Sequence, residues 1–296
     1  MKKAKIILFA VISAVLVSCG TTSTVPITGR KQTLLVSDEQ VLSLSNQQYE
    51  EYMKSAKAST NATNTAMVKR VGQNLANAVV KYLNANNLGA EVSQYQWVFN
   101  LVQDNQVNAF CMPGGKIVVY EGLLPVTQDE ASLAIVLGHE IAHAVAKHSA
   151  ERLSNEYKKQ YGTQILGAVL QGVGVSDGMQ QLISLGSQLG TSLWTSGFSR
   201  KQESEADHMG LIFAAMAGYD PQVATNFWQR MASQGNSGYT IFSDHPSDAT
   251  RIKQIQGWMP EALQYYTPPV AKTTTTTKKT TTTKKSTTTK KSTTKK

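Results

Sequence analysis

The chain has 296 residues and a formal net charge of +9, from 29 basic and 20 acidic side chains. Nine lysines lie in residues 271–296 and three in the first five residues, so residues 19–270 hold 17 basic against 20 acidic side chains. This slightly acidic central part argues against nucleic-acid binding, and it is long enough to bury a large core.

Residues 1–18 have the layout of a bacterial signal peptide. Lysines precede an apolar run from Ile6 to Val17, which as a helix spans roughly 18 Å, less than the ~30 Å hydrocarbon core of a bilayer. The run ends in Leu-Val-Ser-Cys19, which resembles a lipobox, so we expect cleavage after residue 18 and acylation of Cys19. The alternative is an ordinary signal peptide with a chance cysteine. With Cys19 acylated, Cys111 has no partner for an intramolecular disulfide.

Residues 19–36 are polar and rich in turn formers, and we expect them to form a tether. A capping box, Ser37-Asp-Glu-Gln40, begins the first helix of a predicted domain that comprises residues 37–266. The apolar pattern then predicts, in chain order, a helix over 67–83, a strand over 95–102, and a hairpin with strands 107–112 and 116–120.

Helices dominate the second half of the predicted domain. We expect helices from a capping box at Thr127–Glu130 to about Ala150, from one at Ser199–Gln202 to about Gly218, from Asp220-Pro221 to about Ser233, and a short one after Ser247. The Gly-rich residues between 162 and 197 have weak helical character and could form a mobile lid over the site, with ordinary packing as the alternative. The predicted class is α+β, mainly helical with a small β-sheet.

Residues 267–296 form a tail that is rich in threonine and lysine. Such a segment cannot bury apolar surface, and we expect it to be disordered. A solvated spacer is the favoured interpretation, and contact between its lysine pairs and anionic envelope polymers is the alternative.

The string His139-Glu140-Ile-Ala-His143 lies inside a predicted helix and indicates a metal site. Histidines four residues apart differ by about 40° around a helix axis, so both imidazoles can reach one ion. Glu140 lies on the flank of that face, where it can take a proton from water activated by the metal. Two helix-surface histidines around an unrelated acid are the alternative interpretation.

A catalytic zinc site needs a third protein ligand. On one continuous helix His148 would project about 140° away from His143, so we exclude it as that ligand. The next marked helix carries Glu203 and Asp207 on one face, four residues apart, whereas Glu205 points nearly opposite Glu203. A charged, solvated first turn is the alternative for this segment.

Together these residues resemble the gluzincin zinc metallopeptidases of family forty-eight, the group of HtpX, BepA and the CAAX prenyl endopeptidases, and within it the LoiP-type lipoproteins. The resemblance covers roughly residues 25–265 and rests on four strings: Asn108-Ala109-Phe110 with Pro113-Gly-Gly115, His139 to His148, Ser199 to Asp207, and His245-Pro246. It implies that one Zn²⁺ per chain binds His139, His143 and Glu203. It also implies that Glu140 is the catalytic base, that Asp207 supports the site or donates a proton, and that His245 can contact the metal. A simple turn is the alternative for the His245-Pro246 pair.

The resemblance further implies an endopeptidase that acts on misfolded cell-envelope proteins. Because Gly20 and not an aspartate follows Cys19, the lipoprotein is expected in the outer membrane, facing the periplasm. The strand with Asn108, Ala109 and Phe110 could pair with an extended or unfolded protein substrate, or it could be an ordinary core strand. Two alternatives stay open. One is an envelope chaperone or assembly factor with a structural or latent zinc site, and the other is a structural lipoprotein whose tail holds the cell wall.

Overall fold

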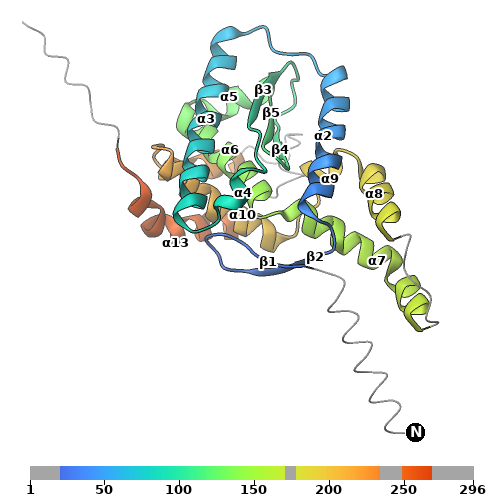
Figure 1. Ribbon diagram of the computed structural model, residues 1–296. Helices are drawn as coiled ribbons and strands as arrows, with labels where there is room; N and C mark the ends of the chain where they lie inside the picture. The colour runs from blue at the N-terminus through green and yellow to red at the C-terminus, as the bar shows by residue number, and fades with distance from the viewer. Residues whose placement is uncertain (1–20, 171–177, 234–248, 269–296) are drawn as a thin grey trace, which may run out of the picture.

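The computed structural model describes residues 21–170, 178–233 and 249–268, and it describes side chains in 21–162, 184–232 and 250–268. Cys19, His245 and the tail from residue 269 onward lie outside the described residues, as do residues 1–18. The α+β class is confirmed, because the described residues are mainly helical and include two small sheets (Figure 1). No helix within the described ranges is both long and apolar enough to cross a bilayer.

The helices of the described residues, with the one 3-10 turn η1, are α2 Asp38–Ser55, α3 Ala62–Ala85, α4 Gly89–Val92, η1 Glu121–Leu123, α5 Leu124–Thr127, α6 Glu130–Val145, α7 His148–Leu170, α8 Gly178–Leu189, α9 Ser192–Thr195, α10 Arg200–Met216, α11 Val223–Ser233 and α13 Ala249–Tyr265. The strands are β1 Thr21–Thr24, β2 Lys31–Leu34, β3 Val98–Val102, β4 Ala109–Met112 and β5 Lys116–Tyr120.

The larger sheet has the order β3-β5-β4, with β5 parallel to β3 and antiparallel to β4. Both faces of this sheet are buried, which explains its nearly continuous apolar sequence. Ile117 and Val119 of β5 join a core formed with α3, α6 and α10, whereas Val118 joins a second core with residues of α2, α7 and α9. The predicted strand and hairpin are therefore confirmed, and β4 is the edge strand nearest α6.

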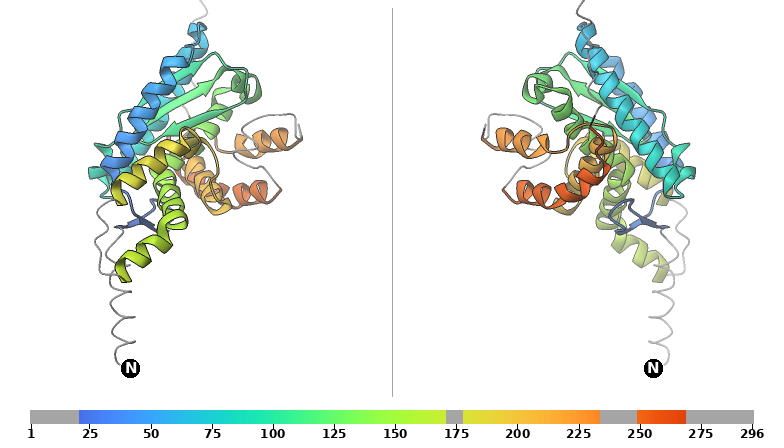
Figure 2. Two further views of the ribbon diagram at one scale, coloured as in Figure 1. Left: turned by 90° about the vertical axis from the view of Figure 1, so that its right-hand side faces the viewer. Right: turned by 90° about the vertical axis from the view of Figure 1, so that its left-hand side faces the viewer.

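The expected tether is corrected by the structure. Residues 21–34 form an antiparallel hairpin of β1 and β2 that lies against α7 (Figure 2). The reason is burial: Val25 is 1% exposed and Leu34 is 5% exposed, and the Gln32 side chain donates to the Ala146 carbonyl at 2.8 Å. Folded structure therefore begins before Ser37. The segment is mostly polar, so its composition does not indicate these few anchoring side chains.

Two of the three expected capping boxes are confirmed, at Ser37 and Ser199. The third is wrong: Asp129, not Thr127, caps α6, because its carboxylate accepts from the Ser132 amide at 2.6 Å. Thr127 ends the preceding short helix instead.

The helix that we expected to run to about Ala150 is two helices. The first, α6, ends at Val145, and Lys147 takes a left-handed conformation with φ of 57° before α7 begins. An amine–carboxylate contact of 2.8 Å between Lys147 and Asp38 of α2 holds this residue in place. No glycine marks the break, and for this reason it was not evident from the sequence.

Candidate metal centre

Two helices bring the predicted metal ligands together in the core of the domain. His139 and His143 lie on α6 and Glu203 lies in the first turn of α10, and one donor atom from each is within 4.8 Å of the others. The two Nε2 atoms are 3.0 Å apart, and each is 3.4 Å from a carboxylate oxygen of Glu203. All three side chains are buried. The structure therefore gathers the three ligands that the resemblance implied.

The close approach of α6 and α10 depends on a pair of glycines. A Cβ atom added at Gly138 would lie 2.7 Å from the Gly210 carbonyl oxygen, and one added at Gly210 would lie 2.6 Å from the His139 amide nitrogen. Real Cβ atoms do not approach other atoms so closely. Any side chain at either position would separate the two helices and so move Glu203 away from the imidazoles.

Asp207 orients the first imidazole. Its carboxylate lies 2.8 Å from His139 Nδ1 and 2.6 Å from a guanidinium nitrogen of Arg251, which comes from α13. The Arg251 guanidinium in turn lies 3.5 Å above the ring of Trp228 on α11. Burial alone would raise the pKa of Asp207, but the charge of Arg251 and the hydrogen bond with His139 hold it below its ordinary value.

The carboxylates around His139 also change its own proton affinity. Burial alone would lower the pKa of His139, but the hydrogen bonds and charges of Asp207 and Glu203 outweigh burial and raise it to about 9. These negative charges favour a cation at the imidazole. A divalent metal ion meets the same electrostatic demand as a proton.

His148 orients the second imidazole. Its Nδ1 lies 2.9 Å from His143 Nδ1, and its Nε2 lies 3.0 Å from a Glu205 carboxylate oxygen. Burial lowers the pKa of His148, which favours the neutral ring. The Phe198 ring also stacks on the His143 ring at a centroid distance of 4.1 Å. The exclusion of His148 as a ligand agrees with the cluster, but no sequence pattern indicates its contact with His143.

Glu140 is 1% exposed and follows His139 directly on α6. Burial and the nearby charge of Glu140 both raise the pKa of the Cys111 thiol on β4. The Glu140 carboxylate therefore lies near the edge strand β4, which contains Ala109 and Phe110 and directly follows Asn108. Cys111 itself is buried, and among the described residues it is a free thiol.

Comparison with known proteins agrees with this arrangement. The family model described as peptidase family M48 matches residues 62–259, which include both ligand helices. The chain belongs to peptidase family M48. Three relatives illustrate the similarity. The chain is 38% identical to the mitochondrial metalloendopeptidase OMA1 of Schizosaccharomyces pombe over 58% of its own length and 49% of the relative.

The human metalloendopeptidase OMA1 is 31% identical over 81% of this chain and 46% of its own length. The β-barrel assembly-enhancing protease of Escherichia coli is 28% identical over 52% of this chain and 32% of its own length. The chain thus spans about half the length of the OMA1 proteins that it matches, or less.

The donor set of this M48 chain fits Zn²⁺. Zinc accepts imidazole nitrogen and carboxylate oxygen at about 2.0–2.2 Å, which places neighbouring ligand atoms of a tetrahedral site roughly 3.4 Å apart. The two Nε2 atoms are 3.0 Å apart, close to that value, and each lies 3.4 Å from a different oxygen of the Glu203 carboxylate. Three protein ligands leave a fourth position open, as catalytic zinc sites require.

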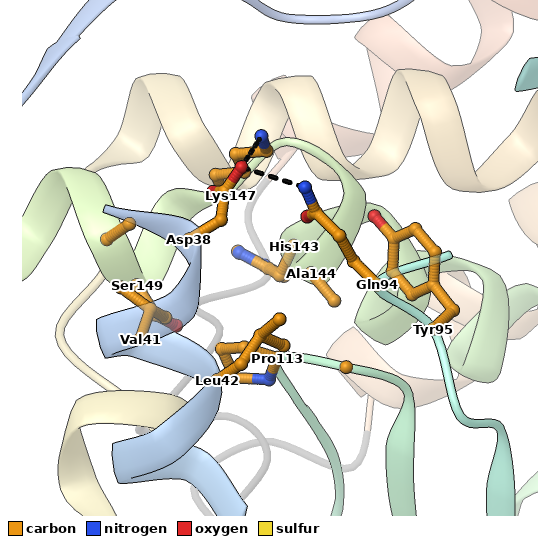
Figure 3. A pocket seen from close by; sticks show the side chains of 12 residues that line it. Asp38, Val41, Leu42, Gln94, Tyr95, Pro113, His143, Ala144, Lys147 and Ser149 are labelled. Carbon is orange, nitrogen blue, oxygen red and sulfur yellow. Dashed lines mark hydrogen bonds and ion pairs between the residues drawn. The ribbon is translucent and has the colours of Figure 1, made fainter. Parts of the chain in front are cut away.

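A small cavity lies on another side of His143, between α2, the β4–β5 turn and the junction of α6 with α7 (Figure 3). Its volume is about 30 Å³, which is room for a water molecule and too little for a substrate side chain. Asp38 accepts hydrogen bonds there from Lys147 at 2.8 Å and from Gln94 at 2.9 Å.

Proposed function

We propose that the protein is a zinc metalloendopeptidase that cleaves extended or unfolded protein substrates. The observation that carries this proposal is the convergence of His139, His143 and Glu203 on one point, with the carboxylate of Glu140 on the same helix as the two histidines. A structural zinc site would need the ligands but would not need Glu140. The M48 relatives that carry the name metalloendopeptidase support the same reaction.

Each residue of the site has a distinct task in this proposal. A bound zinc ion would lower the pKa of water to about 7 and polarise the carbonyl of the scissile bond. Glu140 acts as general base: it accepts a proton from the attacking water and passes it to the leaving amine. Its burial keeps competing water away from the proton transfer.

For Asp207, the sequence left two roles open, support of the site or proton donation. We favour support, because the carboxylate is engaged with His139 Nδ1 and Arg251 and its pKa is held low. A carboxylate that stays ionised cannot donate a proton. Asp207 would instead keep His139 in the tautomer whose Nε2 lone pair faces the metal.

The edge strand β4 is the candidate substrate platform. One side of β4 pairs with β5, and α6 packs against the strand. An extended peptide could add to the other side through main-chain hydrogen bonds. Ala109 and Phe110 of β4, and Asn108 directly before it, are at most 5% exposed as whole residues, so their side chains would not contact the peptide.

We also propose a location and a biological role. The sequence before Cys19 supports a lipoprotein of the bacterial envelope that faces the periplasm. Labelling with a radioactive fatty acid tests the acylation, and replacement of Cys19 should abolish the label. The relative from Escherichia coli, named for enhancing β-barrel assembly, supports a role in quality control of misfolded envelope proteins. His245 remains a candidate contact of the metal.

The test compares purified full-length protein with Glu140→Gln on unfolded casein. We expect the substitution to lower the rate by at least about 100-fold, because it removes the general base, while one zinc per chain is retained. Glu130→Gln is the matched control, since it lies in the first turn of the same helix and is exposed. Equal rates for Glu140→Gln and the unchanged protein would reject the proposed mechanism.

A further inference from the structure

A buried chain of polar groups connects the metal ligand His143 to the N-terminal hairpin. His143 contacts His148, His148 contacts Glu205, and the Arg30 Nε atom donates to Glu205 at 2.7 Å. His148 is fully buried and Glu205 is 6% exposed. Arg30 lies between β1 and β2, so residues more than a hundred positions apart in sequence meet behind one ligand of the metal.

The hydrogen bonds of this chain can run in only one direction. The Nδ1 atoms of His143 and His148 are 2.9 Å apart, so one of them must carry the proton and the other must accept it. Because Glu205 can only accept when ionised, His148 donates from Nε2 and accepts at Nδ1. His143 therefore donates from Nδ1, which leaves the Nε2 lone pair facing the metal position.

Glu205 is fixed from the hairpin side by two residues. The Thr28 hydroxyl donates to one of its oxygens, and Arg30 donates to the other. Burial alone would raise the pKa of Glu205, but these hydrogen bonds, together with that of His148, lower it to about 2. The remaining guanidinium nitrogens of Arg30 bind the Glu151 carboxylate at 2.7 and 2.9 Å.

We propose that His148, Glu205 and Arg30 are positioning residues that fix the tautomer and ring orientation of His143, and that the N-terminal hairpin is thereby part of the metal site. The proposal rests on the zinc site of the proposed function but not on peptide cleavage. Groups that orient a metal-binding imidazole typically change metal affinity by 10- to 100-fold when they are replaced. A hairpin that only covered α7 would contribute to stability and would leave metal affinity unchanged.

The test measures zinc affinity of the full-length chain by competition with a chromophoric chelator, together with the visible spectrum of the cobalt-substituted protein. We expect Glu205→Gln and Arg30→Gln each to raise the zinc Kd about tenfold and to alter the cobalt bands. Arg30→Lys keeps a charge beside Glu205 and should recover part of the loss. Thermal unfolding of the metal-free proteins shows that each variant is folded.

A double substitution tests whether the groups act in series. In His148→Asn the amide oxygen can still accept from His143, but the side chain is too short to reach Glu205. We expect Glu205→Gln to raise the zinc Kd no further once His148→Asn is present. If the two substitutions have independent effects that multiply, the proposal that Glu205 acts on His143 through His148 is overturned.

Glu151→Gln is the matched control for Arg30. It removes the other ion pair of Arg30 and leaves the bond between Arg30 and Glu205 in place. We expect it to lower the melting temperature while the zinc Kd changes by less than about twofold. The proposal is overturned if Glu151→Gln raises the Kd as much as Arg30→Gln does, or if Glu205→Gln leaves both Kd and cobalt spectrum unchanged. Since cleavage is not measured, neither result depends on the Glu140→Gln test.

Discussion

His139 and His143 lie one turn apart on the same helix, yet the two imidazoles are supported in different ways. A carboxylate, Asp207, contacts His139 directly. On the Nδ1 side of His143, a second imidazole, that of His148, stands between the ring and the carboxylate of Glu205. His139 is therefore stabilised by a charged group that contacts it directly. His143 is stabilised by a neutral imidazole, whose orientation depends in turn on the charge of Glu205.

The two supports also come from opposite ends of the folded chain. Arg251 of α13 and Trp228 of α11 lie behind Asp207, whereas Arg30 of the N-terminal hairpin lies behind Glu205. Both carboxylates belong to α10, the helix that also supplies the ligand Glu203. One helix thus organises the whole site, and the two ends of the chain stabilise it from either side.

Replacing the direct support should have the largest effect. In Asp207→Asn the charge beside His139 is lost and the buried guanidinium of Arg251 loses a charged partner. We expect the zinc Kd to rise about 100-fold and the free energy of unfolding to fall by about 3 kcal/mol. Chelator competition and urea unfolding measure the two quantities. An effect on Kd no larger than that of Glu205→Gln would show that the two supports are equivalent.

The second-largest effect is expected from a substitution that disturbs the supports of His139 and His143 together. Gly210→Ala inserts a methyl group against the His139 backbone, so it displaces α10 with all three of its carboxylates. We expect a loss of about 1–3 kcal/mol in stability and weaker zinc binding. In Gly257→Ala, within α13, the methyl group meets no atom within 4 Å, and we expect it to stabilise by about 0.5–1 kcal/mol. Equal stability changes in the two variants would refute the close-packing role of Gly210.

The smallest effect is expected at Glu151, outside both supports. Its ion pair with Arg30 should contribute about 1 kcal/mol at neutral pH. Burial alone would raise the pKa of Glu151, but Arg30 holds it below the ordinary value of 4.5. A lowered pKa stabilises the fold above that value, and the gain is lost as the pH falls below it.

The melting temperatures of the metal-free protein and Glu151→Gln should therefore differ most near pH 7. We expect the difference to shrink as the pH falls below 4.5 and Glu151 is protonated. Working without metal removes any contribution from acid release of zinc. A difference that stays constant between pH 7 and pH 3 would contradict the ion pair.

Much of the site could be predicted from the sequence, because the patterns that indicate it lie within short segments of the chain. The spacing of His139 and His143 reports one helix face, and the capping box at Ser199 fixes the first turn in which Glu203 lies. The resemblance then identified the third ligand. These signals depend on neighbours within a few residues, which sequence patterns record.

The supports could not be predicted, because they depend on long-range packing. Arg251 and Arg30 reach the site from segments that carry no local signal of contact with α10. The prediction for His148 assumes one continuous helix, but the helix breaks at Lys147, and the break turns the His148 side chain toward His143. The glycines at 138 and 210 were visible, but their meaning appears only when the two helices are placed together.

The central claim is that His139, His143 and Glu203 share one zinc ion. Anomalous X-ray diffraction from crystals of the zinc-loaded protein, recorded on both sides of the zinc absorption edge, tests it most directly. We predict one peak per chain at about 2.0–2.2 Å from both Nε2 atoms and from a Glu203 oxygen. A peak on Glu205 or elsewhere, or no peak between these three side chains at full zinc content, would contradict the account.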